Sequence, residues 1–246
     1  MLVCKKLVIQ LTQDLQRGDL ENFQTIFQSA GYQCELVDLI KGINDNILIP
    51  TNLDAHVLII RNGIEYITKM GDHTQLFNEL INLNYDKKAK MKGKVVNKHA
   101  RYNLCFDKIS QEPNYDQGKG RIISYDEIPI TNKIKNFLES LINKNIPDAP
   151  ELLVAEANYY YDIAKCGINF HGDSERKKVI AFRIGAPLGL FYQWYHCCSS
   201  VSPIMEFNLN EGDIYFMSEK ATGNDWKKQK ILTLRHAAGS KSFLKI

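Results

Sequence analysis

The sequence lacks long apolar runs, paired cysteine motifs and a strong excess of one charge. None of its 246 residues lie in an uninterrupted apolar stretch of about 18 or more, so we expect no membrane-spanning helix. The first residues contain neither a long apolar region nor a small-residue cleavage site, which is not the pattern of a signal peptide. The six cysteines show no CxxC pair and no zinc-ribbon spacing. They fit reduced thiols, and we expect the cytoplasm or another reducing intracellular compartment.

The charge balance and the overall composition narrow the class of protein further. The net charge of +3 is too small to imply a nucleic-acid partner by itself. A content of 44% hydrophobic and 24% charged residues is ordinary for a globular protein. The length suits one large domain, or a catalytic domain with an N-terminal appendage.

Residues 1–86 alternate between strand-like and helix-like patterns. Strands are expected at 7–11, 34–39 and 56–60, and helices at 19–27 and 74–83, where apolar residues recur at helical spacing. This predicts a small N-terminal α/β region. It contains no recognisable site motif, so its role stays open.

A basic stretch at 87–101 separates this region from the rest of the chain, with seven Lys or Arg in fifteen residues. A solvated linker is one interpretation, and charge runs commonly serve that purpose. Contact with nucleic-acid phosphates is the other, and its strength would depend on salt. Two aromatic residues that follow this stretch, Tyr102 and Tyr115, are candidate substrate contacts because aromatic rings stack on bases. The polar loop 110–121 around Tyr115 is equally consistent with a plain connector.

The remaining sequence, after an amphipathic helix expected at 130–143, is rich in short strands. They are expected at 152–161, 167–170, 178–184, 188–195, 203–209, 213–217, 231–236 and 242–246. About eight short strands at close intervals are typical of a β-sandwich or β-barrel.

The clearest chemical signal, His171-Gly172-Asp173, follows the second of these strands. Residues i and i+2 of an extended chain point to the same side, so the imidazole and the carboxylate can meet on one ion. A second histidine downstream is either His196, in a strand-end loop, or His236, near the end of the penultimate strand. We favour His236. Two histidines and one carboxylate form the facial triad of non-haem Fe(II) oxygenases, which keeps open positions on the metal.

With these elements in this order, residues 150–246 resemble the Fe(II)/2-oxoglutarate-dependent dioxygenases, and most closely their AlkB-like branch. In that branch an Asn-x-Tyr before the His-x-Asp contacts 2-oxoglutarate, and Asn158 and Tyr160 stand in that place. An acidic residue two positions after the metal aspartate faces the substrate base, which matches Glu175. The neighbouring Arg176 is a further candidate substrate contact.

The resemblance implies a fold, a set of cofactors and a reaction. The fold is α+β, with a double-stranded β-helix (jelly-roll or cupin-like) core at 95–246. Fe(II), held by His171, Asp173 and His236, would act with 2-oxoglutarate and O2 to hydroxylate a C–H bond. In the AlkB-like version the reaction is oxidative N-demethylation of nucleic acid. The alternatives are a hydroxylase of proteins or small molecules and, from another class, a non-catalytic β-sandwich binding module.

The C-terminal end departs from the AlkB-like pattern, because the early second histidine of that branch is absent. One alignment makes Arg235 the terminal arginine that binds 2-oxoglutarate. The other resembles the prolyl hydroxylases: His236 is the ligand, and Lys241 or Lys245 binds the distal carboxylate. A basic residue is required because a buried carboxylate without a partner costs several kcal/mol. The strand expected at 242–246 favours the second alignment.

Overall fold

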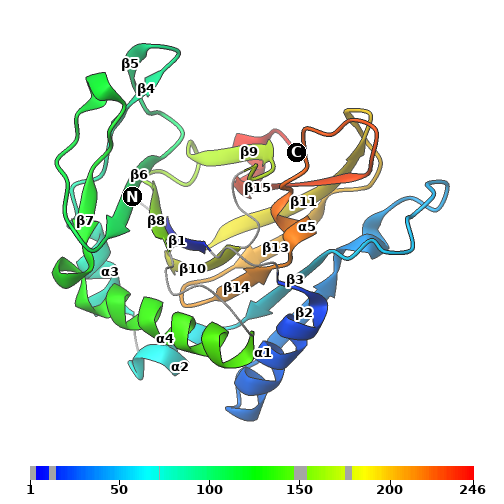
Figure 1. Cartoon of the computed structure of the whole chain (residues 1–246), viewed down its shortest axis with the longest axis horizontal. Coiled ribbons are helices and arrows are strands. Elements are labelled where there is room, and N and C mark those ends of the chain that lie inside the picture. The colour runs from blue at the N-terminus through cyan, green and yellow to red at the C-terminus, as the bar shows by residue number, and fades with distance from the viewer. Residues whose placement is uncertain (1–3, 11–14, 72, 147–153, 175–178) are drawn as a thin grey trace.

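The computed structural model describes residues 4–10, 15–71, 73–146, 154–174 and 179–246. The chain is a mixed α+β protein whose sheets are mostly antiparallel, as the sequence predicts. Figure 1 shows sheets that curve around a common interior, with helices on one outer side. None of the helices within the described ranges has the length and apolar composition to span a membrane.

An eight-stranded sheet forms the main layer. From edge to edge it contains β2 (Cys34–Asp38), β3 (His56–Ile60), β14 (Ile214–Met217), β10 (Val179–Gly185), β1 (Cys4–Gln10), β8 (Val154–Tyr160), β6 (Tyr102–Asp107) and β7 (Ile122–Ser124). Only the pair β6–β7 is parallel. Strands from both sides of the expected boundary at 86–95 therefore share one sheet, and the N-terminal β1 lies between β10 and β8.

A smaller sheet faces one side of this layer. It contains β12 (Ser199–Ser200), β11 (Leu188–His196), β15 (Thr233–Gly239) and β9 (Gly167–His171), and β13 (Met205–Leu209) also pairs with β11. Apolar side chains of the two sheets meet between them. The large sheet contributes Val57, Ala181 and Tyr215, and the small sheet contributes Leu190 and Trp194.

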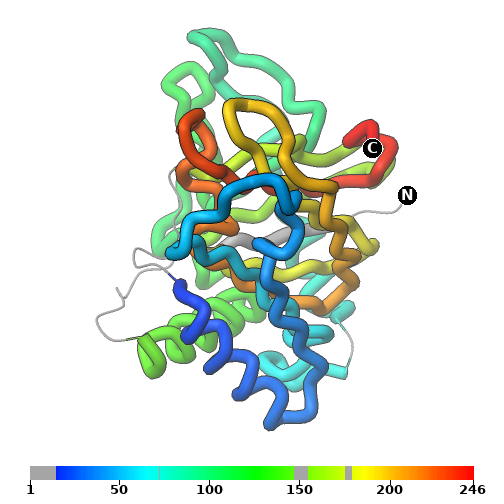
Figure 2. Tube along the Cα trace, turned by 90° about the vertical axis from the view of Figure 1, so that its right-hand side faces the viewer, coloured from blue at the N-terminus to red at the C-terminus, as the bar shows by residue number. Residues whose placement is uncertain are grey.

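Helices cover the other side of the large sheet. They are α1 (Arg17–Ser29), α2 (Gly63–Thr68), α3 (Thr74–Ile81) and α4 (Pro129–Asn145). Apolar side chains of α1 and α4, including Phe23 and Leu138, pack with Phe182 and Phe216 of the sheet in one buried cluster. In both views of the chain the helices lie at one end of the molecule (Figures 1 and 2). The short helices are α5 (Glu219–Thr222), α6 (Lys241–Leu244), η1 (Leu39–Gly42), η2 (Tyr115–Gln117) and η3 (Tyr125–Glu127).

The basic stretch is an ordered hairpin and not an irregular linker. Its strands are β4 (Lys88–Met91) and β5 (Lys94–Asn97). Lys92 and Gly93 join them with positive φ angles of 48° and 81°, as in the two-residue turns whose twist matches paired strands. The hairpin lies at the end of the molecule away from α1 and α4 (Figure 2).

The strand expected at 242–246 is wrong, because this segment forms α6. Ser240 begins the helix, and its side-chain oxygen accepts a hydrogen bond from the Phe243 amide at 3.2 Å. A serine N-cap favours a helical turn over an extended chain. The apolar residues at 243, 244 and 246 are therefore no evidence of a last strand.

We expect Phe216→Ala to lower the free energy of unfolding by about 3–5 kcal/mol. Phe216 is fully buried, and its ring lies 5.1 Å from that of Phe23, centroid to centroid. Urea unfolding followed by circular dichroism measures the change. The matched control is Ile109→Ala, at a side chain that is 80% exposed, where we expect a change under about 0.5 kcal/mol. Equal losses in the two variants would contradict this view of the core.

Candidate metal centre

His171, Asp173 and His236 meet at one edge of the small sheet. The last residue of β9, His171, lies directly opposite His236 of β15 in the strand register. Their ring centroids are 4.4 Å apart. Asp173 Oδ1 lies 3.6 Å from His171 Nε2, and Asp173 Oδ2 lies 3.9 Å from His236 Nε2. The three candidate ligand atoms all lie within 4.8 Å of one another, so this cluster could hold one metal ion after small side-chain rotations.

The imidazole of His171 is oriented by its own strand. Its Nδ1 lies 2.8 Å from the backbone carbonyl oxygen of Asn169. When Nδ1 carries the ring proton, it donates a hydrogen bond to this carbonyl, and the lone pair of Nε2 is left for a metal ion. A carbonyl on the far ring nitrogen is the usual outer support of a metal-bound histidine.

The backbone around Asp173 is held by the turn after α5. The Asp173 amide donates to the carbonyl of Thr222 at 2.9 Å. The chain passes this turn so closely that a Cβ atom on Gly172 would lie 1.9 Å from the Gly223 carbonyl oxygen and 2.6 Å from Trp226 Cδ1. Glycine at position 172 is therefore required for the aspartate to reach the two histidines.

The cluster is closed on one side and open on the other. The side chain of His236 is 3% exposed, that of Asp173 is 13% exposed and that of His171 is 27% exposed. A metal here would thus be reached from the His171 side. An open position beside two histidines and a carboxylate is what a catalytic, as opposed to a closed structural, metal site needs.

Asn158 and Tyr160 are buried on the face of β8 that looks toward the small sheet. Asn158 Oδ1 accepts hydrogen bonds from Arg101 Nε at 2.6 Å and from Asn103 Nδ2 at 2.7 Å. These two donors fix the side-chain amide with its oxygen turned toward them. Its NH2 group is then the side that can donate to another ligand.

The three basic residues expected to bind 2-oxoglutarate make contacts away from the cluster. The guanidinium of Arg235 lies 4.0 Å from the ring centroid of Tyr195, and Arg235 faces the opposite side of β15 from His236 because neighbours in a strand alternate. Lys241 Nζ pairs with Glu206 Oε2 at 2.6 Å, and its side chain is 61% exposed. Lys245 is exposed at the end of α6.

The structure describes two of the four expected substrate contacts. Glu175 and Arg176 lie outside the described residues. Tyr102 stacks on Tyr161 with ring centroids 4.5 Å apart. The hydroxyl of Tyr115 donates to Asp86 Oδ1 at 2.7 Å, and burial followed by this hydrogen bond raises the pKa of Tyr115 to about 12. Tyr115 is thus neutral at physiological pH, and both tyrosines contact neighbours outside the metal cluster.

The sequence reasoning missed a buried polar group between the two sheets. Arg183 of β10 is fully buried, and its guanidinium lies 5.9 Å and 5.8 Å from the ring centroids of Tyr160 and Tyr215. Tyr192 of β11 lies opposite His236 in register. The signal available in the sequence was a lone arginine within the otherwise apolar strand Val179–Gly185.

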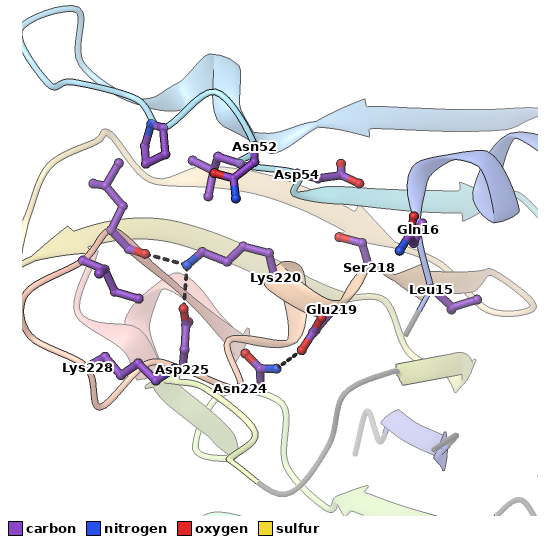
Figure 3. A pocket seen from close by; sticks show the side chains of 14 residues that line it. Leu15, Gln16, Asn52, Asp54, Ser218, Glu219, Lys220, Asn224, Asp225 and Lys228 are labelled. Carbon is purple, nitrogen blue, oxygen red and sulfur yellow. Dashed lines mark hydrogen bonds and ion pairs between the residues drawn. The ribbon is translucent and has the colours of Figure 1, made fainter. Parts of the chain in front are cut away.

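A separate cavity of about 640 Å³ lies on the outer side of α5 (Figure 3). Its lining includes Asp54, Ser218, Lys220 and Asp225, and none of the three metal-ligand candidates. Lys220 Nζ already bonds Asp225 Oδ2 and the Leu232 carbonyl, each at 2.6 Å. The convergent metal-binding chemistry of the described residues is therefore at His171, Asp173 and His236.

The chain is similar to a viral protein of known sequence. No family model matches the chain. "Uncharacterized protein R156" of Acanthamoeba polyphaga mimivirus is 48% identical over 227 residues, which cover 92% of this chain and 86% of the mimivirus protein. The name of the mimivirus protein states no activity.

We expect Gly172→Ala to weaken binding of a divalent metal by at least about tenfold, in the range found when the outer support of a metal site is lost. The added methyl group must displace the Asp173 segment from the turn after α5. Titration with Co(II), followed by visible absorption, measures the affinity. Gly18→Ala is the control, since a Cβ there meets no atom within 4 Å. Unchanged metal affinity in folded Gly172→Ala protein would show that this turn does not position the aspartate.

Proposed function

The chain belongs to the family of the mimivirus protein R156, and we propose that it is an Fe(II)- and 2-oxoglutarate-dependent dioxygenase that hydroxylates a C–H bond of its substrate. One observation carries the proposal: the neighbours His171 and Asp173 converge on one point with His236, from a distant segment of the chain. Two imidazoles and one carboxylate with open positions form the ligand set of non-haem Fe(II) oxygenases.

The proposed core is a double-stranded β-helix built from the two facing sheets. Strands β8, β9, β10, β11, β13, β14 and β15 follow one another in the chain. In this proposal β1 supplies the eighth strand, because it lies between β8 and β10. The N-terminal segment would then complete the catalytic core. Such a core places the end of β9 beside the middle of β15, where His171 and His236 lie opposite each other.

The iron and the 2-oxo acid, when bound, would split O2 so that one oxygen atom enters the substrate C–H bond and the other converts 2-oxoglutarate to succinate and CO2. The protein residues would provide geometry. The Asn169 carbonyl sets the His171 ring, and Arg101 and Asn103 turn the Asn158 amide so that its NH2 can donate to a carboxylate. Burial of His236 keeps water from one side of the cluster.

For the substrate we propose nucleic acid, as in AlkB-like N-demethylation, because of the basic hairpin β4–β5. A cavity of about 370 Å³ lies under this hairpin, and four lysines contribute to its walls: Lys88, Lys90, Lys98 and Lys119. The cavity also includes Asn103 and Glu156. Asn103 lies opposite Asn158 in register, so the cavity opens on the sheet face that carries Asn158. Lysines at such a position suit a substrate with phosphate groups.

Anaerobic titration with Fe(II) and then 2-oxoglutarate tests the proposed reaction. We expect the visible charge-transfer band of an iron-bound 2-oxo acid in the wild-type protein. Removing one imidazole in His171→Ala or His236→Ala should abolish the band, since the iron loses one of three protein ligands. His196→Ala is the matched control and should keep the band, because His196 is the exposed last residue of β11. No band in the wild type would refute the proposal, and a band that survives in His236→Ala would refute the assignment of that ligand.

Salt-dependent binding tests the nucleic-acid substrate. Lys88 and Lys94 are exposed on the hairpin. We expect Lys88→Gln/Lys94→Gln to reduce the slope of log affinity against log salt for a single-stranded oligonucleotide by about 1.4, or about 0.7 for each lost phosphate contact. Lys41→Gln/Lys144→Gln removes the same charge from exposed positions outside the hairpin and should leave the slope unchanged. Equal slopes in all three proteins would favour a protein or small-molecule substrate.

A further inference from the structure

We propose that Arg183, with the hydroxyl groups of Tyr192 and Tyr215, forms the site for the distal carboxylate of the co-substrate, and that this site selects a dicarboxylic over a monocarboxylic 2-oxo acid. This inference rests on the proposed function. It assigns the anion site to β10, in place of the C-terminal residues that the sequence suggests.

Among the described residues, Arg183 is the buried Lys or Arg, and it lies between the two sheets. It shares a face of β10 with Val179 and Ala181, which belong to the core between the sheets. Its side chain is fully buried, and its amide bonds the Asp213 carbonyl at 3.0 Å. Arg235, Lys241 and Lys245 all contact other groups or solvent outside this interior. A carboxylate bound in the interior needs a cation there, because pairing is what offsets the desolvation of both charges.

The surroundings of Arg183 suit a planar anion. The rings of Tyr160 and Tyr215 lie 5.9 Å and 5.8 Å from the guanidinium carbon. Aromatic faces attract a cation through the negative side of the ring quadrupole. A guanidinium fixed in this way presents its N–H groups in a rigid fork that matches the two oxygens of a carboxylate.

Tyr192 connects this cation with the metal cluster. It lies opposite His236 in register, and the two rings are 6.2 Å apart, centroid to centroid. Tyr192 also belongs to the buried cluster between the two sheets that contains Tyr215. The ring of Tyr215 lies 5.8 Å from the Arg183 guanidinium, so Tyr192 lies between His236 and the surroundings of Arg183 in this proposal.

The Tyr192 hydroxyl itself points to a ligand. It is buried and has no hydrogen-bond partner among the described residues. Leaving a buried donor unsatisfied costs about 1–3 kcal/mol, and a bound carboxylate would accept its hydrogen bond. A 2-oxo acid whose keto end is at the metal and whose far carboxylate is at Arg183 would accept a hydrogen bond from the Tyr192 hydroxyl and contact the Arg183 guanidinium. Pyruvate has no second carboxylate and would gain neither contact.

The test compares Arg183→Met with the wild type in protein loaded with Mn(II) in place of iron. Isothermal titration with 2-oxoglutarate and with pyruvate measures binding without turnover, and Mn(II) electron paramagnetic resonance reports metal uptake. We expect Arg183→Met to bind Mn(II) normally, to lose at least about 100-fold in 2-oxoglutarate affinity, as for a lost charged hydrogen-bond pair, and to bind pyruvate as the wild type does. Arg235→Met tests the competing assignment and should bind 2-oxoglutarate within about threefold of the wild type.

Tyr192→Phe keeps the inference testable if Arg183→Met does not fold. It removes one hydroxyl, and we expect at least about a tenfold loss in 2-oxoglutarate affinity. Tyr195→Phe, on the same strand with its hydroxyl bonded to Gln193, is the control. Normal 2-oxoglutarate affinity in folded Arg183→Met or in Tyr192→Phe would overturn the anion site.

Failure of the proposed function gives a different result. A wild-type protein that takes up no metal would refute the dioxygenase. Succinate binding to the metal-free protein would then test the anion site alone. We expect the wild type to bind succinate and Arg183→Met to lose this binding. A wild type that does not bind succinate would overturn the anion site. A protein that binds Mn(II) but no 2-oxoglutarate would overturn both proposals.

Discussion

The pairing of β15 with β9 is the constraint on which the candidate site depends. It sets His236 directly opposite His171, although the two residues are far apart in the chain. The turn after α5 then brings Asp173 to both rings through its bond to the Thr222 carbonyl. A shift of β15 by one residue would turn His236 to the other face and place Arg235 in the cluster. The register of one strand pair therefore decides whether three candidate metal ligands or only two come together.

The same two-sheet arrangement explains why polar side chains are found in a buried interior. The outer face of the large sheet is apolar and packs on α1 and α4. The inner face carries Asn158, Tyr160 and Arg183 among apolar residues, and each is buried. Stability alone would favour apolar residues at such positions, because buried charges rarely add to stability. Their presence between the sheets is what the proposed recognition of a polar co-substrate requires.

The sequence predicts the elements of the fold better than their partners. Apolar periodicity locates α1 and α4, and short apolar or alternating runs locate β8 to β11 and β13 to β15. They do not show that β1 lies between β8 and β10, since pairing between distant segments leaves no local pattern. Residues 242–246 were misread because a few apolar residues fit a strand and a short helix equally well, and the Ser240 cap decides between them. The hairpin β4–β5 was overlooked because its lysines hide the usual alternation.

The residues of the candidate site could likewise be predicted only in part from the sequence. His171 and Asp173 are neighbours in sequence, so spacing alone identifies them, and His236 follows from the need for a third ligand. Proposing Arg183 in place of Arg235, Lys241 or Lys245 requires knowing which strand faces the interior, which the sequence does not show. The central claim is that His171, Asp173 and His236 hold one Fe(II) ion. X-ray absorption at the iron edge of the anaerobic Fe(II)-loaded protein tests it most directly. We predict one iron per chain with scattering from two imidazoles and oxygen ligands; sulfur scattering, or no bound iron, would contradict the account.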